Sequence, residues 1–67
     1  MKRLYLFEVL HEITGISVHS AHIEIHQNSE DEFKLEVYKI LSGMSLTLGM
    51  FFPNEVKMRA TLIRNLN

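Results

Sequence analysis

The absence of cysteine from a chain of only 67 residues is the feature that most limits what it can fold into. Without disulfides, a chain this short must gain its stability from one hydrophobic core, a metal ion or a partner subunit. The composition can supply a core, because 46% of the residues are hydrophobic and 22% are charged. We therefore expect a single small domain over residues 1–67, with a partner or a metal as additional support.

Charge and hydropathy argue against several classes of protein. The formal net charge is −1 at pH 7, so the chain lacks the global positive charge that supplies most non-specific affinity for nucleic acid. Glu8 interrupts the apolar run near Met1 and no small-residue cleavage site follows, which argues against a secretory signal. No stretch approaches the roughly 18 apolar residues of a membrane span. We expect a soluble, cytoplasmic protein that has no membrane partner.

The first segment has the apolar spacing of an amphipathic helix. Apolar side chains recur three or four residues apart, at Leu6, Val9, Leu10 and Ile13. Gly15 then stands where a helix commonly ends with a residue in the left-handed conformation. The pattern predicts a helix over residues 3–14.

Three later segments alternate between apolar and polar residues, which is the period of a strand. In residues 17–26, Ile23 and Ile25 alternate with polar neighbours. Residues 45–52 and 56–63 alternate in the same way on either side of Pro53-Asn54-Glu55, a sequence typical of a turn. The pattern predicts strands over all three ranges, with the last two forming a hairpin.

Residues 32–41 fit two interpretations. As a helix, the segment has a Ser29 cap with Glu32 three residues later, and Gly43 just past its end. As a strand, it has β-favouring residues in alternation, and a helix would leave Leu35 and Tyr38 off the apolar stripe. The pattern favours a strand and leaves the helix open.

The elements together predict an α+β domain with two layers. The favoured architecture is an N-terminal helix packed on a four-stranded antiparallel β-meander. The alternative is an α-β-α-β-β two-layer domain, in which residues 32–41 are helical.

One short cluster of residues has side chains that can bind a metal ion. His22, Glu24 and His26 share one face of the predicted strand, so either histidine could share a metal with Glu24. The two histidines lie about 13 Å apart along a strand, so a closed site needs a further ligand from Glu36 or a second subunit. The competing interpretation is an ordinary solvated strand face. We therefore keep these residues as a candidate metal site and predict no cofactor.

The sequence contains no pattern typical of an enzyme. Serines, histidines and acidic residues occur, but no nucleophile elbow or glycine-rich loop accompanies them. The three glycines lie far apart, so they form no loop that could cradle a phosphate. We expect a protein without catalytic activity.

Apolar residues left over from the predicted core point to a binding surface. Phe51 and Ile63 fall on the outward side of the predicted terminal hairpin, where they could be neighbours. Tyr38 is a further apolar residue outside the core, and Lys57 and Arg59 lie on a strand predicted to form a sheet edge. These five residues are the predicted partner-binding site.

The leading hypothesis is a small non-enzymatic protein-binding module. Its partner would be a larger host protein that it regulates or inhibits, as small proteins of phages and mobile elements do, or a second copy in a homo-oligomer. A nucleic-acid-binding regulator is the first alternative, because Lys34, Lys57 and Arg59 could share a face with the histidines. A metal-dependent protein using His22, Glu24 and His26 is the second.

Overall fold

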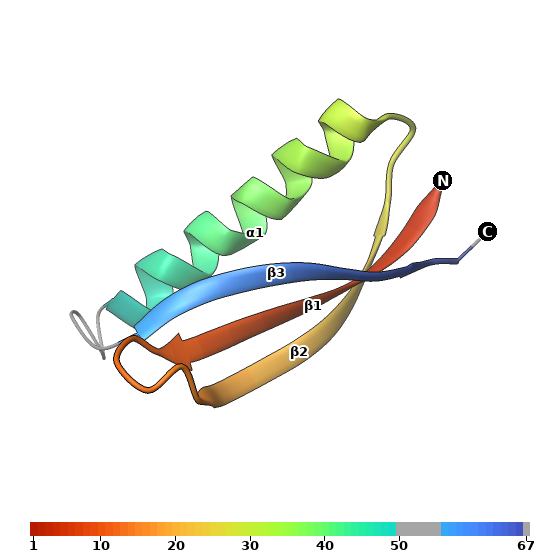
Figure 1. Cartoon of the computed structure of the whole chain (residues 1–67). Helices are drawn as coiled ribbons and strands as arrows, with labels where there is room; N and C mark the ends of the chain where they lie inside the picture. Colours follow the sequence, from red (N-terminus) through yellow and green to blue (C-terminus); the bar gives the residue numbers. More distant parts are fainter. Residues whose placement is uncertain (50–55, 67) are drawn as a thin grey trace.

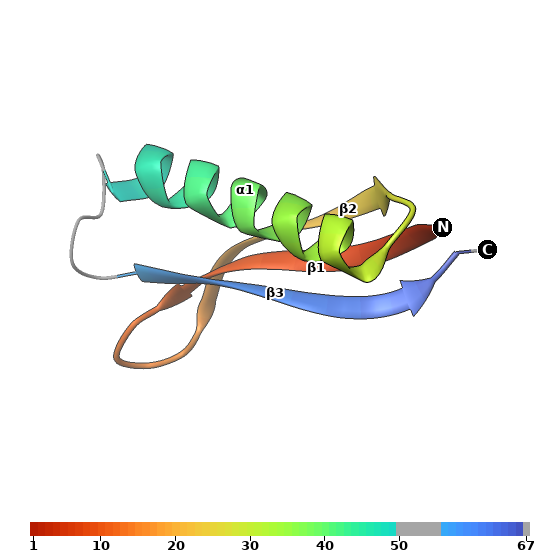
Figure 2. The same ribbon diagram turned by 90° about the horizontal axis from the view of Figure 1, so that it is seen from above.

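The structure, a computed structural model, describes residues 1–49 and 56–66 and consists of three antiparallel strands and one helix (Figure 1). The elements follow one another as β1 (Lys2–His11), β2 (Ser17–His26), α1 (Glu30–Gly49) and β3 (Val56–Asn65). The sheet order is β2-β1-β3, and α1 lies across one face of this sheet (Figure 2). The α+β class is confirmed, but the helix follows two strands instead of preceding the sheet, and the described residues form three strands instead of four.

The central strand β1 is buried to an unusual degree. Tyr5, Phe7, Val9 and Leu10 are all 9% exposed or less, and the strand pairs with a neighbour on each side. The helix predicted for residues 3–14 is therefore wrong. Its spacing arose because the run from Leu4 to Leu10 is apolar at nearly every position, and such a run fits a helical stripe as well as a buried strand.

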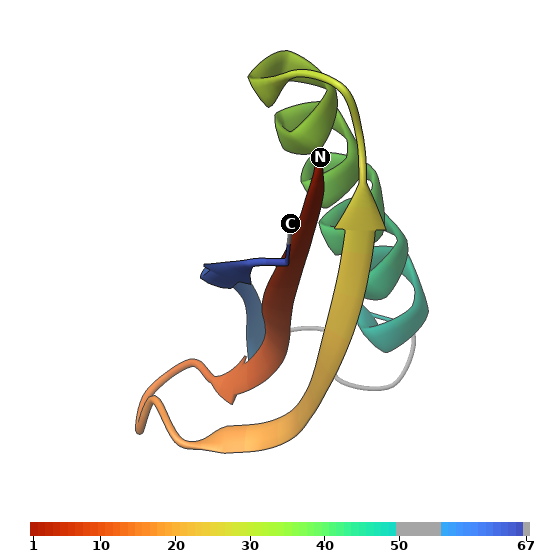
Figure 3. The same ribbon diagram turned by 90° about the vertical axis from the view of Figure 1, so that its right-hand side faces the viewer.

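A tight turn joins β1 to β2, whose bounds confirm the strand predicted over residues 17–26. The amide of His11 donates to the carbonyl of Ile16 at 2.9 Å, and the amide of Gly15 donates to the carbonyl of His11 at 2.8 Å. Gly15 adopts φ 71°, the left-handed conformation expected of it, although it closes a hairpin and does not cap a helix. The end of this hairpin curls away from α1 (Figure 3).

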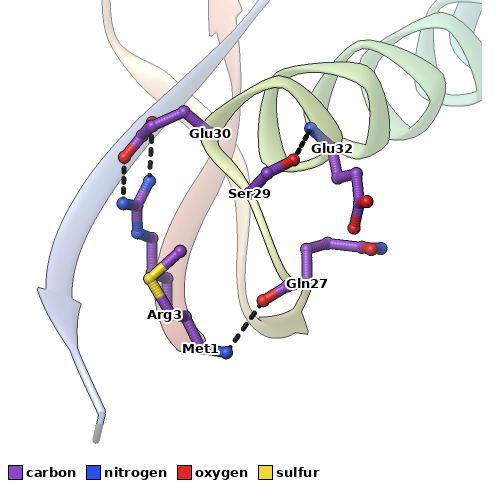
Figure 4. Close-up of polar contacts among 6 residues, drawn as sticks. All are labelled: Met1, Arg3, Gln27, Ser29, Glu30 and Glu32. Atoms are coloured by element: carbon purple, nitrogen blue, oxygen red, sulfur yellow. Dashed lines mark hydrogen bonds and ion pairs between the residues drawn. The ribbon is translucent and has the colours of Figure 1, made fainter.

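The strand predicted over residues 32–41 is wrong, because α1 covers this range and continues through residues 45–49 of the next predicted strand. The cap noted in the sequence forms: the amide of Glu32 donates to Ser29 Oγ at 3.3 Å (Figure 4). The carboxylate of Glu32 in turn accepts from the amide of Asn28 at 3.1 Å. Gly43 lies inside the helix and does not end it.

Residues 50–52 of the predicted strand and the turn predicted at Pro53-Asn54-Glu55 lie outside the described residues. The following strand, β3, confirms the prediction for residues 56–63 and continues to Asn65. Its register with β1 is interrupted once, between the partners of Leu4 and Tyr5, where Ile63 is the extra residue.

The core lies between α1 and the sheet. Tyr5, Phe7, Ile25 and Phe33 form its buried centre, and the ring of Tyr5 lies 6.2 Å from that of Phe7 and 6.5 Å from that of Phe33. Half-buried apolar residues surround it: Ile23, Val37, Ile40, Leu41, Met44 and Ala60. On α1 these residues recur at helical spacing from Phe33, so one stripe of the helix faces the sheet.

An ion pair fixes the start of α1 to the start of β1 (Figure 4). The guanidinium of Arg3 donates to both carboxylate oxygens of Glu30, and the Nη1 to Oε2 distance is 3.0 Å. The same guanidinium lies 4.2 Å from the centre of the Phe33 ring. The hydrogen bonds from Arg3 hold the pKa of Glu30 below its ordinary value.

α1, the helix of the described part of the chain, is not apolar over a length that could cross a membrane.

Replacing Phe33 by Ala is expected to lower the free energy of unfolding by about 3 kcal/mol, because the ring is 1% exposed in the core. Leu35→Ala is expected to change it by less than about 0.5 kcal/mol, since Leu35 is 54% exposed. Urea denaturation of the two variants measures both values. Equal losses would contradict the helix, because only a strand places both side chains on one face.

Glu30→Gln is expected to destabilise the chain at pH 7 and to lose this effect in acid. Because the folded state lowers the pKa of Glu30, its ion pair contributes stability above the unfolded value of about 4.3, and this contribution disappears as the pH falls through the folded pKa. The urea midpoints of wild type and variant should therefore converge once the pH has fallen through the folded pKa of Glu30. Asp31→Asn, which removes the neighbouring charge but leaves the Arg3–Glu30 pair, is the control.

Candidate functional site

The outer face of the sheet, the face opposite α1, carries five of the residues predicted to bind a partner or a metal ion. By the strand alternation, His22, Glu24 and His26 of β2 and Lys57 and Arg59 of β3 lie on this face. Their sharing of one face confirms the alternation seen in the sequence. Their exposure is high: all five are exposed residues.

Acidic groups divide the positive charges of the outer face. Arg59 donates to Glu8 Oε1 from Nη2 at 2.8 Å and from Nε at 3.2 Å, and Glu8 is 9% exposed. Nζ of Lys2 lies 3.8 Å from Glu24 Oε2. This pairing satisfies a nearly buried carboxylate and leaves a face of mixed sign, which is unlike the continuous positive stripe of a nucleic-acid-binding protein.

The metal site predicted at His22, Glu24 and His26 lacks the completing ligand expected within the chain. Glu36 lies on α1, which covers the opposite face of the sheet, so its expected contribution is wrong. Within residues 1–49 and 56–66 the structure brings together no three His, Cys, Asp or Glu side chains that could hold a metal ion. The suggestion that a second subunit supplies the ligand stays a prediction.

Tyr38 and Ile63 are both exposed, but on different elements. Tyr38 is 69% exposed on α1, whereas Ile63 is 45% exposed at the irregularity of β3. Phe51, the predicted neighbour of Ile63, lies outside the described residues. The four predicted partner-binding residues that the structure describes therefore do not share one surface, because Tyr38 lies on α1 while Lys57 and Arg59 lie on the outer face of the sheet.

Tyr38 instead belongs to an outer row of α1, which consists of Leu35, Tyr38 and Leu46. Their side chains are 54%, 69% and 76% exposed, on the side of the helix opposite the stripe that meets the sheet. Apolar residues so exposed on a regular helix are not required by the core. The sequence carried one signal for this row, since Leu35 and Tyr38 did not fit the apolar stripe of a helix.

An apolar groove with a volume of about 500 Å³ separates the second half of α1 from β2. Phe7 lies at its floor, Ala21 and Ile23 line it from β2, and Ile40 and Met44 line it from α1. The groove follows from the position of the helix, which contacts β3 more extensively than β2. It was not anticipated from the sequence, because it depends on where the helix crosses the sheet.

The strand beside this groove has an unpaired edge. Within the described residues, β2 pairs with β1 alone. Met1 and Gln27 donate backbone hydrogen bonds to each other, at 2.8 Å and 3.0 Å, so they form a hydrogen-bonded pair. Along an antiparallel ladder such pairs alternate with pairs that are not hydrogen-bonded to each other. The amides and carbonyls of His22, Glu24 and His26 consequently point away from β1, towards the open edge.

Comparisons of the chain with protein-family models, with curated proteins and with solved structures find no match.

Gly43→Ala is expected to raise the free energy of unfolding by about 0.5–1 kcal/mol, because glycine in a helix interior costs that much relative to alanine. An added Cβ meets no atom within 4 Å at this position beside the groove. Thermal unfolding measures the gain. Gly15→Ala, the same chemical change at φ 71°, should destabilise by about 1 kcal/mol, and a gain at both positions would contradict the assigned backbone.

Proposed function

We propose that the chain is a non-enzymatic protein-binding module that docks the outer row of α1 into a groove on a larger protein and regulates that protein. The observation that carries the proposal is the exposure of Leu35, Tyr38 and Leu46 on one side of a helix whose other side already fills the core. A helix that carries apolar residues on two sides leaves one of these sides exposed to water unless a partner covers it.

The spacing of the outer row suits recognition of a helix by a groove. Leu35 and Tyr38 are three residues apart, a spacing with which amphipathic helices place anchor residues in a groove. Leu46 follows Leu35 by eleven residues, which is about three turns and returns to the same side of the helix. Leucine and tyrosine side chains contribute most when a partner desolvates them fully. The outer row would therefore supply the anchor residues of the interface, and the neighbouring polar residues of α1 would form its rim.

Two lysines indicate the chemistry of the partner. Lys34 and Lys39 are exposed, and the helical period places them on opposite sides of Leu35 and Tyr38. A partner groove with an apolar floor and acidic rims would match this arrangement, because complementary rim charges raise association rates and reject other partners. Regulation of the larger protein would follow from occupying that groove.

The double variant Leu35→Gln, Leu46→Gln is expected to lose partner binding while keeping its fold, because both side chains are exposed in the chain itself. Wild-type chain immobilised in a lysate of its source organism should retain a partner, which is then purified and titrated by calorimetry. The Kd should rise at least about tenfold for the double variant, because burial of a leucine side chain contributes roughly 1.5–3 kcal/mol and a tenfold change corresponds to about 1.4 kcal/mol.

The matched control is Ile63→Gln, which removes an exposed apolar side chain of similar size from β3. Its Kd should remain within about twofold of wild type. If Ile63→Gln abolishes binding and the double variant binds normally, the outer row of α1 is not the docking surface.

A further inference from the structure

The two edges of the sheet differ in how well they resist pairing with another strand. β3 carries Lys57, Arg59 and Arg64 together with the irregularity at Ile63, and charged residues and bulges are the features that protect an edge. β2 has neither lysine nor arginine, and its one irregularity with β1, at Val18, lies near the start of the strand, so that its register is unbroken from His19 to His26. Of the two edges, β2 is therefore the one better able to pair with a further strand.

We propose that β2 pairs antiparallel with β2 of a second copy of this chain, about a two-fold axis at Ile23, to form one continuous sheet. This inference goes beyond the proposed function, because it concerns a different surface and a different partner. The open-edge amides and carbonyls from Ser20 to His26 would then be paired, in four residue pairs that each exchange two hydrogen bonds.

The order of side chains on β2 selects this register. An axis at Ile23 places His22 opposite Glu24 of the second copy, and the symmetry creates this pair twice. An axis at His22 would set His22 against itself, and an axis at Glu24 would set two carboxylates against each other. An axis at Ile25 would also place a histidine, His26, opposite Glu24, but it would pair only residues 24–26 of each β2, whereas the axis at Ile23 pairs residues 20–26. A carboxylate can accept a hydrogen bond from an imidazole N–H and is destabilised opposite a second carboxylate, so of the two registers that pair Glu24 with a histidine, the one at Ile23 has the longer ladder.

The face towards α1 supports the same register. Ile23 would meet Ile23 of the second copy in a non-hydrogen-bonded pair, where the Cα atoms are about 4.5 Å apart and side chains approach closely. Ala21 would lie opposite Ile25, a small residue against a large one. Because Ala21 and Ile23 also line the groove, the second copy would extend the apolar surface at the open side of that groove.

The absence of cysteine from the chain allows a direct test of the register. Ile23→Cys is expected to form a disulfide-linked dimer on mild oxidation, because a Cα separation of about 4.5 Å lies within the range that a disulfide can bridge. His22→Cys and Glu24→Cys are the matched controls. Their equivalent Cα atoms would be roughly 8–9 Å apart, and they should remain largely unlinked.

Charge variants test the edge without a covalent bond. A double variant His22→Lys, Glu24→Lys and a single variant His22→Glu should each sediment as monomers of about 7.8 kDa, because each places like charges opposite one another. An equimolar mixture should form a heterodimer with a Kd at least tenfold below that of either variant alone. Thermal melts confirm that each variant is folded before mixing.

Several outcomes would overturn the proposal. A wild-type chain that stays monomeric up to 1 mM in sedimentation equilibrium would do so, as would preferential linkage of His22→Cys or Glu24→Cys over Ile23→Cys. A chain that stays monomeric and pairs β2 with a strand of another protein would also contradict the proposed dimer. The double variant Leu35→Gln, Leu46→Gln should lose partner binding but leave dimerisation unchanged. The two proposals can therefore fail independently.

Discussion

Burial of β1 from both sides of the sheet is the constraint on which the rest of the structure depends. β1 pairs with β2 along one edge and with β3 along the other, and it supplies Tyr5 and Phe7 to the core under α1. On the outer face it presents Glu8, which is 9% exposed and is satisfied by Arg59 of β3. The helix packs on the face of the sheet that carries Tyr5, Phe7 and Ile25, because burial of their apolar surface stabilises this arrangement.

The same constraint determines what remains available for binding. A sheet of three strands offers one helix-sized apolar face, so α1 buries the stripe that begins at Phe33 and leaves the outer row of Leu35, Tyr38 and Leu46 uncovered. With the strand order β2-β1-β3 in the described part of the chain, β2 lies at an edge of the sheet. In so small a domain, a large share of the apolar residues stays at the surface, and their arrangement decides what the chain can bind.

The parts predicted correctly from the sequence are those where local periodicity and tertiary environment agree. β2 and β3 are each buried on one face, so apolar and polar residues alternate and their ranges were found. β1 is buried on both faces, which removes the alternation and imitates a helix. The strand predicted over residues 32–41 is a helix instead, because the two residues that do not fit its apolar stripe, Leu35 and Tyr38, are the ones that the structure exposes.

The candidate surfaces were predictable to a similar extent. The common face of His22, Glu24 and His26 followed from strand period alone, whereas the groove and the outer row required the crossing of α1 over the sheet. A two-fold axis perpendicular to the sheet would keep both helices on the same side of a continued β2 pair. Both outer rows would then face one direction, and a partner with two grooves would bind them with an effective concentration set by the dimer geometry. Pairing at β2 and docking at α1 would in this way reinforce each other without sharing a residue.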